Sequence, residues 1–350
     1  MNIGILTFHR GPNYGGYLQA WHMREAIRSL GHKATVINYQ GSKHTEAERF
    51  PLKGIKPSQL KGYAYNWLKS RPFRAPVEEL SDHSFTTKAD EIPWAQFDKV
   101  MVGADVVWDH THLIHGQNPA FFGTLEAQKN TEFVAYAPSC GESTSLSELP
   151  DYVVKGLNRF STIYVRDEAT AKLVEKVTGK KPPLVVDPTW LQDDPEITFK
   201  KRPKNPYVLV YGHGLRGERE EILKAYCRES GLQLISAGSP CKTADKYFLS
   251  LSPLEWVDLF RHAECVVTST FHGLLYAIKY SKPLIFMTRP ASRSKSKLTI
   301  ERCGLESRVV EAGKSFQLGH LQHYLDTSQP TELPLEWIQE SRAALESCVV

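Results

Sequence analysis

Three polar stretches directly follow apolar runs that read as buried strands, and they hold the residues best suited to chemistry. His272 lies in the segment 268–273 after one such run, Arg166 follows a second, and Thr7 to Gly16 follows the first run of the chain. Ligands of open α/β sheets bind at the carboxyl ends of the strands. A histidine titrates near neutral pH, and the glycines of the first stretch would let backbone N–H groups face a ligand at a helix N-terminus. The sequence therefore predicts an enzyme that uses His272.

The first half of the chain alternates apolar runs with amphipathic stretches, as an α/β sheet requires. The expected strands are residues 2–8, 33–39, 97–103, 131–137, 162–167 and 184–189, and the expected helices are 18–30 and 168–178. Gly31 and Gly179 stand where these two helices would end. The βαβ order over residues 2–39 implies a right-handed crossover between parallel strands.

The same alternation returns after a charged, proline-containing linker at residues 192–206. The expected strands of this half are residues 207–212, 232–236, 265–268 and 283–287, and its expected helices include 253–262 and 273–280. At 350 residues the chain exceeds the usual size of one core. We therefore expect two α/β, Rossmann-like domains at 1–190 and 191–333, with a C-terminal helix at 334–350 that packs back on the first domain.

The segment from about 41 to 95 interrupts the pattern with five prolines, frequent basic residues and interleaved aromatic residues. We expect a partly helical flap inserted into the first domain. Leu60, Ala64, Trp67 and Leu68 share one face if the segment is helical. Two interpretations remain open, a solvated surface excursion and a lid that binds the acceptor or faces a membrane.

Composition excludes several classes of protein. The six cysteines are spread singly, without zinc-ligand spacing, so we expect reduced thiols and no metal site. A net charge of +4 is only mildly basic, which predicts no nucleic-acid partner. No apolar run approaches the length of a membrane helix, and the start does not read as a signal peptide. These features favour the cytoplasm, with contact at the inner face of a membrane left open, and the oligomeric state is not predicted.

Five ordered blocks of sequence resemble the polysaccharide pyruvyl transferase family. Asn13-Tyr14-Gly15-Gly16-Tyr17-Leu18-Gln19-Ala20 is similar to the family's Asn-Tyr-Gly-Ala-x-Leu-Gln-Ala start. The other four blocks, in the family's order, are Gly103-Ala104-Asp105-Val106-Val107-Trp108, Val165-Arg166-Asp167-Glu168, Asp187-Pro188-Thr189 and Ser269-Thr270-Phe271-His272-Gly273.

This resemblance implies a fold and a reaction. The fold would be two Rossmann-like domains facing a cleft, as in GT-B glycosyltransferases, with the acceptor in the first domain and the donor in the second. The reaction would move the enolpyruvyl group of phosphoenolpyruvate onto two hydroxyls of a saccharide acceptor, free or lipid-linked, to form a pyruvate ketal and release phosphate. It requires no metal or redox cofactor, so phosphoenolpyruvate is the only co-substrate.

The resemblance also suggests roles for particular residues. His272 would act as acid or base, with Asp105 as a second catalytic candidate, because protonation of the enol carbon and deprotonation of the hydroxyl each need a positioned group. The donor carries a phosphate and a carboxylate, which basic side chains bind well. The donor candidates are Arg166, Thr270, Arg293, Lys295 and Lys297, with Arg289 competing for the same role. The acceptor and loop candidates are His9, Asn13, Tyr14, Gly15 and Trp108.

Simpler roles remain open for most of these side chains. Arg166 could pair with Asp167 or Glu168 instead of the donor, and Asp105 and Trp108 could cap and pack a helix. His9 and Asn13 could simply shape their loop. Some members of the family place an arginine two residues before the histidine, where this chain has Thr270, so Arg293 or Lys295 would have to supply that charge, or the donor differs.

Two other functions stay open at this stage. A glycosyltransferase that uses a nucleotide sugar would have the same fold, because fold does not fix function. A carbohydrate-binding member that has lost catalysis is the second, since Thr270 departs from the pattern of the family.

Overall fold

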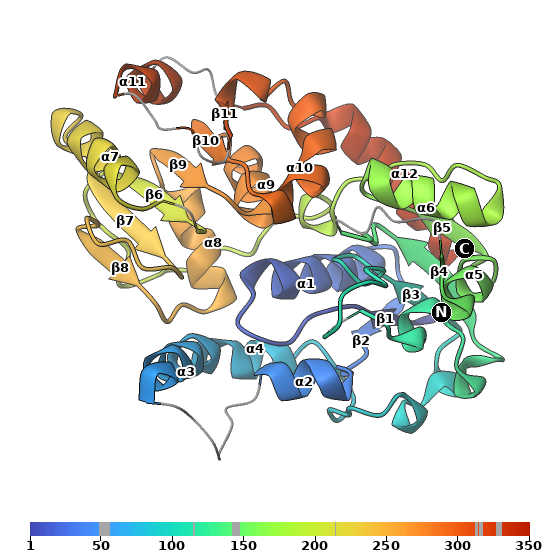
Figure 1. Cartoon of the computed structure of the whole chain (residues 1–350). Coiled ribbons are helices and arrows are strands. Elements are labelled where there is room, and N and C mark those ends of the chain that lie inside the picture. Colours follow the sequence, from blue (N-terminus) through green and yellow to red (C-terminus); the bar gives the residue numbers. More distant parts are fainter. Residues whose placement is uncertain are drawn as a thin grey trace. The chain divides into compact units, whose positions relative to one another are not determined.

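The chain divides into two compact units, each built around one parallel sheet (Figure 1). The computed structural model describes residues 1–48, 57–114, 116–141, 148–213, 215–311, 314, 318–326 and 331–350. The first unit comprises Met1–Ile55, Arg74–Asp193 and Leu335–Val350, and the second comprises Lys56–Phe73 and Asp194–Pro334. The two units are called the first and second unit below.

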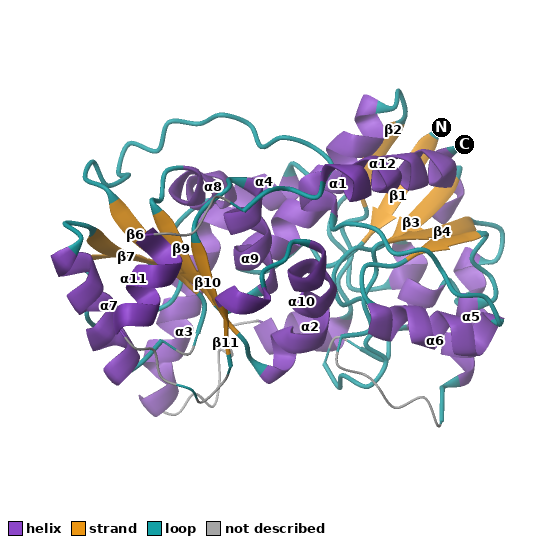
Figure 2. Cartoon of the chain, turned by 90° about the horizontal axis from the view of Figure 1, so that it is seen from above, coloured by secondary structure: helices purple, strands orange, loops and turns teal. Residues whose placement is uncertain are grey.

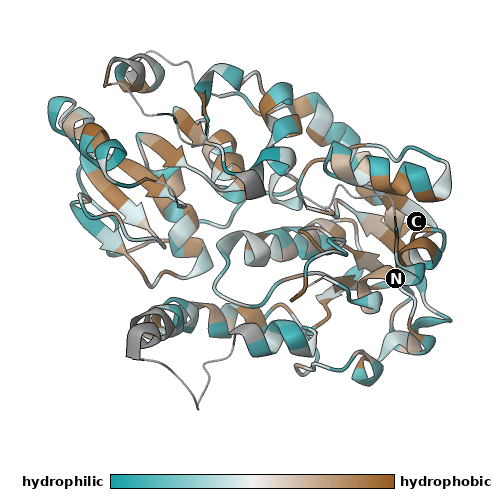
Figure 3. Cartoon of the chain, in the orientation of Figure 1, coloured by the Kyte–Doolittle hydropathy of each residue, from teal (hydrophilic) through white to brown (hydrophobic). Residues whose placement is uncertain are grey.

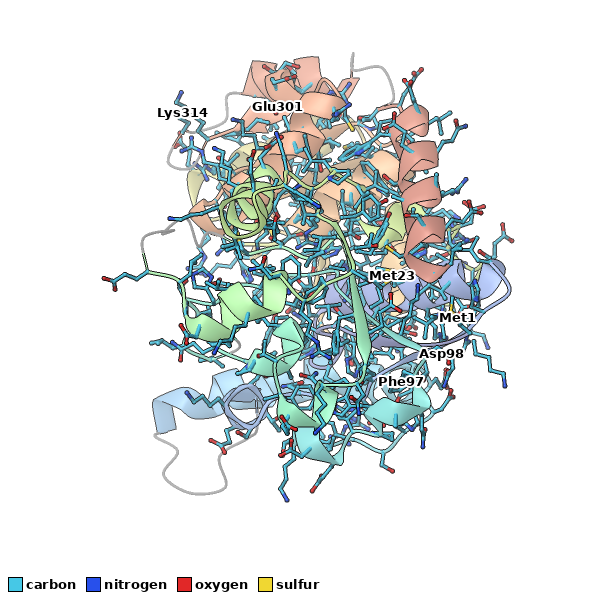
Figure 4. All side chains as sticks on the ribbon, turned by 90° about the vertical axis from the view of Figure 1, so that its right-hand side faces the viewer. Met1, Met23, Phe97, Asp98, Glu301 and Lys314 are labelled. Atoms are coloured by element: carbon cyan, nitrogen blue, oxygen red, sulfur yellow. The ribbon has the colours of Figure 1, made fainter. Side chains whose placement is uncertain are left out.

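The sheet of the first unit has five strands in the order β2-β1-β3-β4-β5, and all neighbours are parallel. The strands are β1 (Asn2–Leu6), β2 (Lys33–Val36), β3 (Lys99–Val102), β4 (Glu132–Tyr136) and β5 (Thr162–Tyr164). The backbone N–H of Asn2 donates to the Asp98 carboxylate at 2.6 Å, which fixes the start of β1 beside β3. Figure 4 labels Met1, Phe97 and Asp98 in this region.

Helices cover both faces of this sheet (Figure 2). They are α1 (Tyr14–Ser29), α2 (Ser42–Glu48), α4 (Arg74–Glu78), α5 (Asp151–Leu157), α6 (Glu168–Thr178) and α12 (Leu335–Val349), with 3-10 turns at Ala89–Glu91, Trp94–Gln96, Pro119–Phe122, Glu126–Gln128 and Pro188–Trp190. Helices α1 and α12 pack together on one face. The Tyr136 hydroxyl donates to the carbonyl of Ser341 at 3.2 Å, so the C-terminal helix is bound to β4 of the first unit.

The sheet of the second unit has six parallel strands in the order β11-β10-β9-β6-β7-β8. The strands are β6 (Tyr207–Tyr211), β7 (Gln233–Ala237), β8 (Lys246–Phe248), β9 (Cys265–Thr268), β10 (Leu284–Met287) and β11 (Val309–Val310). The helices are α3 (Pro57–Ser70), α7 (Glu218–Glu229), α8 (Pro253–Arg261), α9 (Phe271–Lys279), α10 (Pro290–Arg302) and α11 (Leu318–Asp326), with 3-10 turns at Arg71–Phe73 and Glu306–Arg308.

Alternate residues of β6 pack on opposite faces of the second sheet, as the two-residue period of a strand requires. Val208 and Val210 belong to a cluster that includes Leu223 of α7 and Leu321 of α11. On the other face the ring of Tyr211 lies 4.9 Å from that of Trp256 in α8. β6 is therefore buried on both faces, and much of the central strands of both sheets is brown in Figure 3.

The observed elements differ from the sequence predictions at several places. Helix α1 begins at Tyr14 instead of residue 18, so Gly15 and Gly16 lie in its first turn. Residues 184–189 contribute only a single bridge from Leu184 to Val165, because Asp187 then caps a 3-10 turn that starts at a proline. The basic residues Arg293, Lys295 and Lys297, for which the sequence predicted no helix or strand, lie in helix α10.

The expected flap is split between the units. Residues 56–73 belong to the second unit, whereas the sequence placed the whole segment in the first domain. The reason is local bonding: the Tyr65 hydroxyl donates to the carbonyl of Gly238, just past β7, and the Ser250 hydroxyl donates to the carbonyl of Leu68 at 3.0 Å. Leu60 lies among residues whose side chains are outside the described part, so its place on the expected apolar face is not tested. Within the described residues, no helix combines the length and apolar character needed to cross a membrane.

Candidate active site

A buried glutamine organises the carboxyl edge of the first sheet. Gln19 donates to the hydroxyl of Thr7 and to the carbonyl of Phe8, both at 2.9 Å, and accepts from the backbone N–H of Ala104 at 3.2 Å. It thereby joins the loops that follow β1 and β3. A fully buried amide needs such partners for its donors and its acceptor, which gives the glutamine of the first sequence block a positioning role.

A buried ion-pair network lies at the same edge. The Arg166 guanidinium, whose side chain is 2% exposed, lies 2.8 Å from an oxygen of Asp187 and 3.8 Å from one of Asp105. Asp105 lies three residues after the end of β3, in a left-handed conformation with φ of 64°. The network joins three of the sequence blocks. Arg166 therefore pairs with carboxylates, as the simpler interpretation expected, but its partners are Asp105 and Asp187 and not its neighbours in sequence.

His9 is buried, and each of its ring nitrogens lies near an oxygen atom, to one of which the neutral ring can donate. Its Nδ1 lies 3.1 Å from the carbonyl of Thr7 and its Nε2 lies 3.3 Å from the side-chain oxygen of Asn38. Burial lowers the pKa of His9 from 6.5 to about 4, against the smaller effects of these hydrogen bonds. The side chain is therefore neutral at physiological pH and shapes the loop after β1, which is the simpler of its two expected roles.

The other acceptor candidates differ in their exposure to solvent. Trp108 is fully buried, donates from its indole nitrogen to the carbonyl of Phe121 at 3.0 Å and stacks on Phe122. Tyr14 is likewise buried in the first turn of α1, together with Gly15. Asn13, at the N-cap of this helix, is exposed. Trp108 and Tyr14 thus pack the core of the unit, and Asn13 alone of these residues faces solvent.

A cavity of about 210 Å³ lies at this edge of the first sheet. Its lining includes Phe8 after β1, Tyr39 after β2 and Asn118 after β3, so it occupies the position at which open α/β sheets bind ligands. The sequence predicted neither Tyr39 nor Asn118 as a site residue. Helix α2 adds Ser42, Lys43 and His44 to the polar lining, and Thr87 and Gln117 complete it.

In the second unit, two loops meet at the carboxyl edge of the sheet. The hydroxyl of Ser269, after β9, donates to the carbonyl of His213 at 2.6 Å and accepts from the His213 N–H at 2.9 Å. His213 directly follows Gly212, which has a φ of 122° and which Ser269 approaches so closely that a side chain would clash. This close approach fixes His213 beside the start of α9.

His272 is the second residue of α9 and is half-buried. Thr270 is the N-cap of the helix, and its hydroxyl accepts from the N–H of Gly273 at 3.0 Å. A Cβ atom at Gly273 would collide with the hydroxyls of Thr268 and Thr270, so this position requires glycine. Thr270 therefore shapes the helix start, and the block around it places His272 at the positive end of the helix dipole, where anions are stabilised.

Positive charge gathers around His213. Partial burial lowers the pKa of His213, and the charges of Arg289, Lys69 and Arg216 lower it further. Arg289 precedes α10, whereas Lys69 comes from α3, whose hydrogen bonds to residues after β7 and β8 hold it at this edge. Three cations that act in the same direction on one imidazole create a field that favours an anionic ligand. The sequence named Arg289 as a competitor but missed Lys69 and His213.

The basic residues of α10 are less well placed. The side chains of Arg293 and Lys297 are 69% and 72% exposed, and they pair with Glu311 at 3.5 Å and Glu301 at 3.7 Å. Glu301 is labelled in Figure 4. Lys295 is half-buried in the same helix. Of the basic donor candidates in this region, Arg289 acts on His213.

Within the described residues, no group of three or more His, Cys, Asp or Glu side chains is arranged to hold a metal ion. The described cysteines are free thiols, and Cys140, Cys227, Cys241, Cys265 and Cys348 are buried. Burial raises the pKa of the Cys140 thiol to about 12, so this side chain stays protonated. The titratable groups best placed for chemistry are therefore His272 and His213 in the second unit and Asp105 in the first.

The chain matches the model of the family described as polysaccharide pyruvyl transferase over residues 13–290. This range covers most of the chain and all five sequence blocks. No protein with a curated description shows significant similarity to it.

Solved structures resemble the chain over its whole length. The UDP-GlcNAc 2-epimerase from Neisseria meningitidis, bound to UDP-GlcNAc, has a TM-score of 0.53 at 11% identity and covers 100% of both chains. The UDP-GlcNAc 2-epimerase from Methanocaldococcus jannaschii has a TM-score of 0.50 at 11% identity, covering 98% of this chain and 99% of its own. The glycosyltransferase SnogD from Streptomyces nogalater has a TM-score of 0.48 at 14% identity, with 99% and 95% covered. At these identities the likeness to the two epimerases concerns the fold, and the predicted class of two parallel-sheet α/β domains is confirmed.

Proposed function

Because the chain belongs to the polysaccharide pyruvyl transferase family, a family of transferases, we propose that it transfers the enolpyruvyl group of phosphoenolpyruvate to a sugar. The acceptor is a saccharide of a surface or exopolysaccharide precursor, and the products are a cyclic pyruvate ketal and phosphate. The observation that carries the proposal is the cationic carboxyl edge of the second sheet, where His213, Lys69 and Arg289 gather beside the start of α9. The phosphate and carboxylate of phosphoenolpyruvate suit this field.

The reaction balances without a metal or redox cofactor. A proton adds to the CH₂ carbon of phosphoenolpyruvate and converts it to a methyl group, which leaves an oxocarbenium-like centre at the adjacent carbon. One sugar hydroxyl adds to this centre and loses its proton. The bond from that carbon to the phosphate oxygen then breaks, and a second hydroxyl of the same sugar adds. Two hydroxyl protons are released in total, one of which balances the methyl group while the other leaves with phosphate.

We assign the donor to the second unit and the proton transfer at its enol carbon to His272. The imidazole lies at the positive end of α9, and positioned acids of this kind accelerate proton transfer by about 10²- to 10⁴-fold. Lys69, His213 and Arg289 would stabilise the charge that develops on the leaving phosphate. This assignment replaces Arg293 and Lys297, whose exposed side chains pair with glutamates.

In the first unit, Asp105 is our candidate for the group that accepts the hydroxyl proton. Its side chain is 14% exposed and lies at the carboxyl edge of the sheet, where the Arg166 guanidinium and the N–H of Val106 orient it. Arg166 then acts through Asp105 as a positioning residue. We place the reaction in the cytoplasm, where phosphoenolpyruvate is formed, and at the inner membrane face if the acceptor is lipid-linked.

Turnover and donor binding test this proposal together. The wild-type chain would be incubated with phosphoenolpyruvate and a panel of free and lipid-linked β-galactosides and mannosides, and both phosphate release and the mass gain of the acceptor would be measured. Thermal shifts with phosphoenolpyruvate and with nucleoside diphosphates would be recorded in parallel. We expect turnover and a shift with phosphoenolpyruvate; a shift with nucleoside diphosphates alone would favour a glycosyltransferase.

A matched pair of lysine variants locates the donor. Lys69→Met removes one cation from the edge of the second sheet, and Lys297→Met removes an exposed cation of the same unit that pairs with Glu301. We expect Lys69→Met to weaken phosphoenolpyruvate binding by about tenfold, the effect of roughly 1.4 kcal/mol. Lys297→Met should bind as the wild type does. Equal binding by both variants would remove Lys69 from the donor site.

A further inference from the structure

The cavity at the edge of the first sheet has the size of a monosaccharide site. Its volume is about 210 Å³, and one side opens to solvent. This space accommodates one sugar ring, and a longer saccharide would extend through the open side.

The walls of the cavity combine aromatic rings with fixed hydrogen-bonding groups. Phe8 packs edge-on against His44 with ring centroids 5.3 Å apart, and this contact holds α2 against the loop after β1. On the wall that Tyr39 and Asn118 share, the Asn118 amide donates to the Tyr39 hydroxyl at 3.0 Å. Sugar rings present apolar C–H faces and polar hydroxyl edges, so a lining of this mixed kind suits them.

The charge of the lining is one-sided. Lys43 and the titratable His44 lie side by side in α2, and none of the described lining residues is an aspartate or glutamate. A neutral sugar gains little from an ammonium group. An anionic substituent gains a charge-assisted hydrogen bond, which is about twice as strong as a neutral one.

We propose that this cavity binds one sugar ring of the acceptor and that this ring carries an anionic group, either a ring carboxylate or a phosphate ester. This inference rests on the proposed function, because only that reaction makes the bound sugar an acceptor. It assigns specificity for the anionic group to Lys43. Phe8 and Tyr39 contact the ring, while Asn118 orders the Tyr39 hydroxyl at its edge.

Binding measured without phosphoenolpyruvate tests the site directly. The probes are methyl β-galactoside, methyl β-galacturonoside and galactose 1-phosphate, with the mannose series as a second set, titrated by calorimetry or ligand-observed NMR. We expect the anionic members of one series to bind more tightly than the neutral glycoside. Comparing the uronate with the sugar phosphate then shows whether the site prefers a ring carboxylate or a phosphate ester.

Three variants separate the site from the rest of the unit. Lys43→Met should weaken anionic binding by about five- to tenfold and leave neutral glycoside binding unchanged. Ser42→Trp, a change at an exposed lining position, should block all binding without unfolding the unit. Lys88→Met is the control, because Lys88 lies outside the lining and pairs with Glu91 at 3.0 Å.

The outcomes distinguish this inference from the proposed function. Equal affinity for neutral and anionic probes, an unaffected Lys43→Met variant, or no binding by any probe would overturn the anion-specific site. Turnover of a neutral acceptor with full activity in Lys43→Met would overturn it while leaving the pyruvyl transfer intact. Binding of an anionic probe in a chain that never releases phosphate from phosphoenolpyruvate would support the site and count against the proposed reaction.

Discussion

The carboxyl edges of the two sheets differ in charge compensation: charges are paired in the first unit and are of one sign in the second. In the first unit, Arg166 is buried between Asp187 and Asp105, and burial keeps His9 neutral. In the second unit, the charges that act on His213 are all positive, and Arg289 is among them. Both edges occupy the same position in their folds, after the ends of parallel strands.

This difference indicates that the charges of the first unit hold protein groups in position, whereas those of the second unit are suited to bind a ligand. A buried charge must be compensated, since an uncompensated one costs several kcal/mol, so the network of the first unit holds its loops in place and directs Asp105. Clustered cations create a positive electrostatic potential, which attracts an anionic ligand. We therefore propose the second unit as the place of the donor, which carries two anionic groups, and the cavity of the first unit as the place of the sugar.

The largest effect that we expect comes from His272 in the second unit. His272→Gln should lower the rate of pyruvyl transfer by about 10²- to 10⁴-fold, because the variant lacks the proton that the enol carbon takes up. Thermal melting should change little, since the side chain is only half-buried. The matched control is His262→Gln, a side chain 40% exposed at the end of α8, on the opposite edge of the same sheet. Equal rates in both variants would exclude His272 from catalysis.

We expect the loss of Arg166 to lower the stability of the fold in addition to the rate of turnover. Arg166→Met leaves the carboxylates of Asp187 and Asp105 without their cation and should lower the free energy of unfolding by about 3–5 kcal/mol. Arg293→Met removes an exposed pair with Glu311 and should change it by about 1 kcal/mol or less. Urea unfolding measures both.

A second substitution sharpens this result. Adding Asp187→Asn to Arg166→Met should recover part of the lost stability, because it removes the buried carboxylate that the first change left unpaired. A single Arg166→Met variant as stable as Arg293→Met would show that the first unit does not depend on its ion-pair network.

His9 gives a smaller effect that depends on pH. Its pKa is lowered from 6.5 to about 4 in the fold, so between these values the unfolded chain binds a proton that the folded chain does not. The contribution to stability is complete above pH 6.5 and falls as the pH falls towards 4, by up to about 3 kcal/mol. His9→Gln does not titrate. The stability difference between wild type and this variant should therefore shift against the wild type between pH 7 and pH 4.5, and a constant difference would contradict the buried neutral histidine.

Much of the fold could be predicted from sequence because parallel strands buried on both faces are short apolar runs. β1, β6 and β9 were found in this way. β8 was missed because Lys246 and Tyr247 make it partly polar, and β11 because it has only two residues.

The candidate site was predicted less completely than the fold. His272 was located by its place after β9 and by the family block around it. Lys69 was missed because it lies in a segment without clear periodicity, which packs at the second sheet through bonds of Tyr65 and Leu68. Trp108 shows the opposite error, since side chains that pack a core and side chains that contact ligand look alike in sequence.

The most direct measurement is an NMR titration of His213 with and without saturating phosphoenolpyruvate, its signal identified by loss in His213→Gln. In the free protein, partial burial and the nearby cations lower the pKa of His213. A bound phosphate or carboxylate favours the protonated imidazole, so we expect the donor to raise this pKa. Binding of phosphoenolpyruvate that leaves the pKa of His213 unchanged, or no binding at all, would contradict a donor site at the edge of the second sheet.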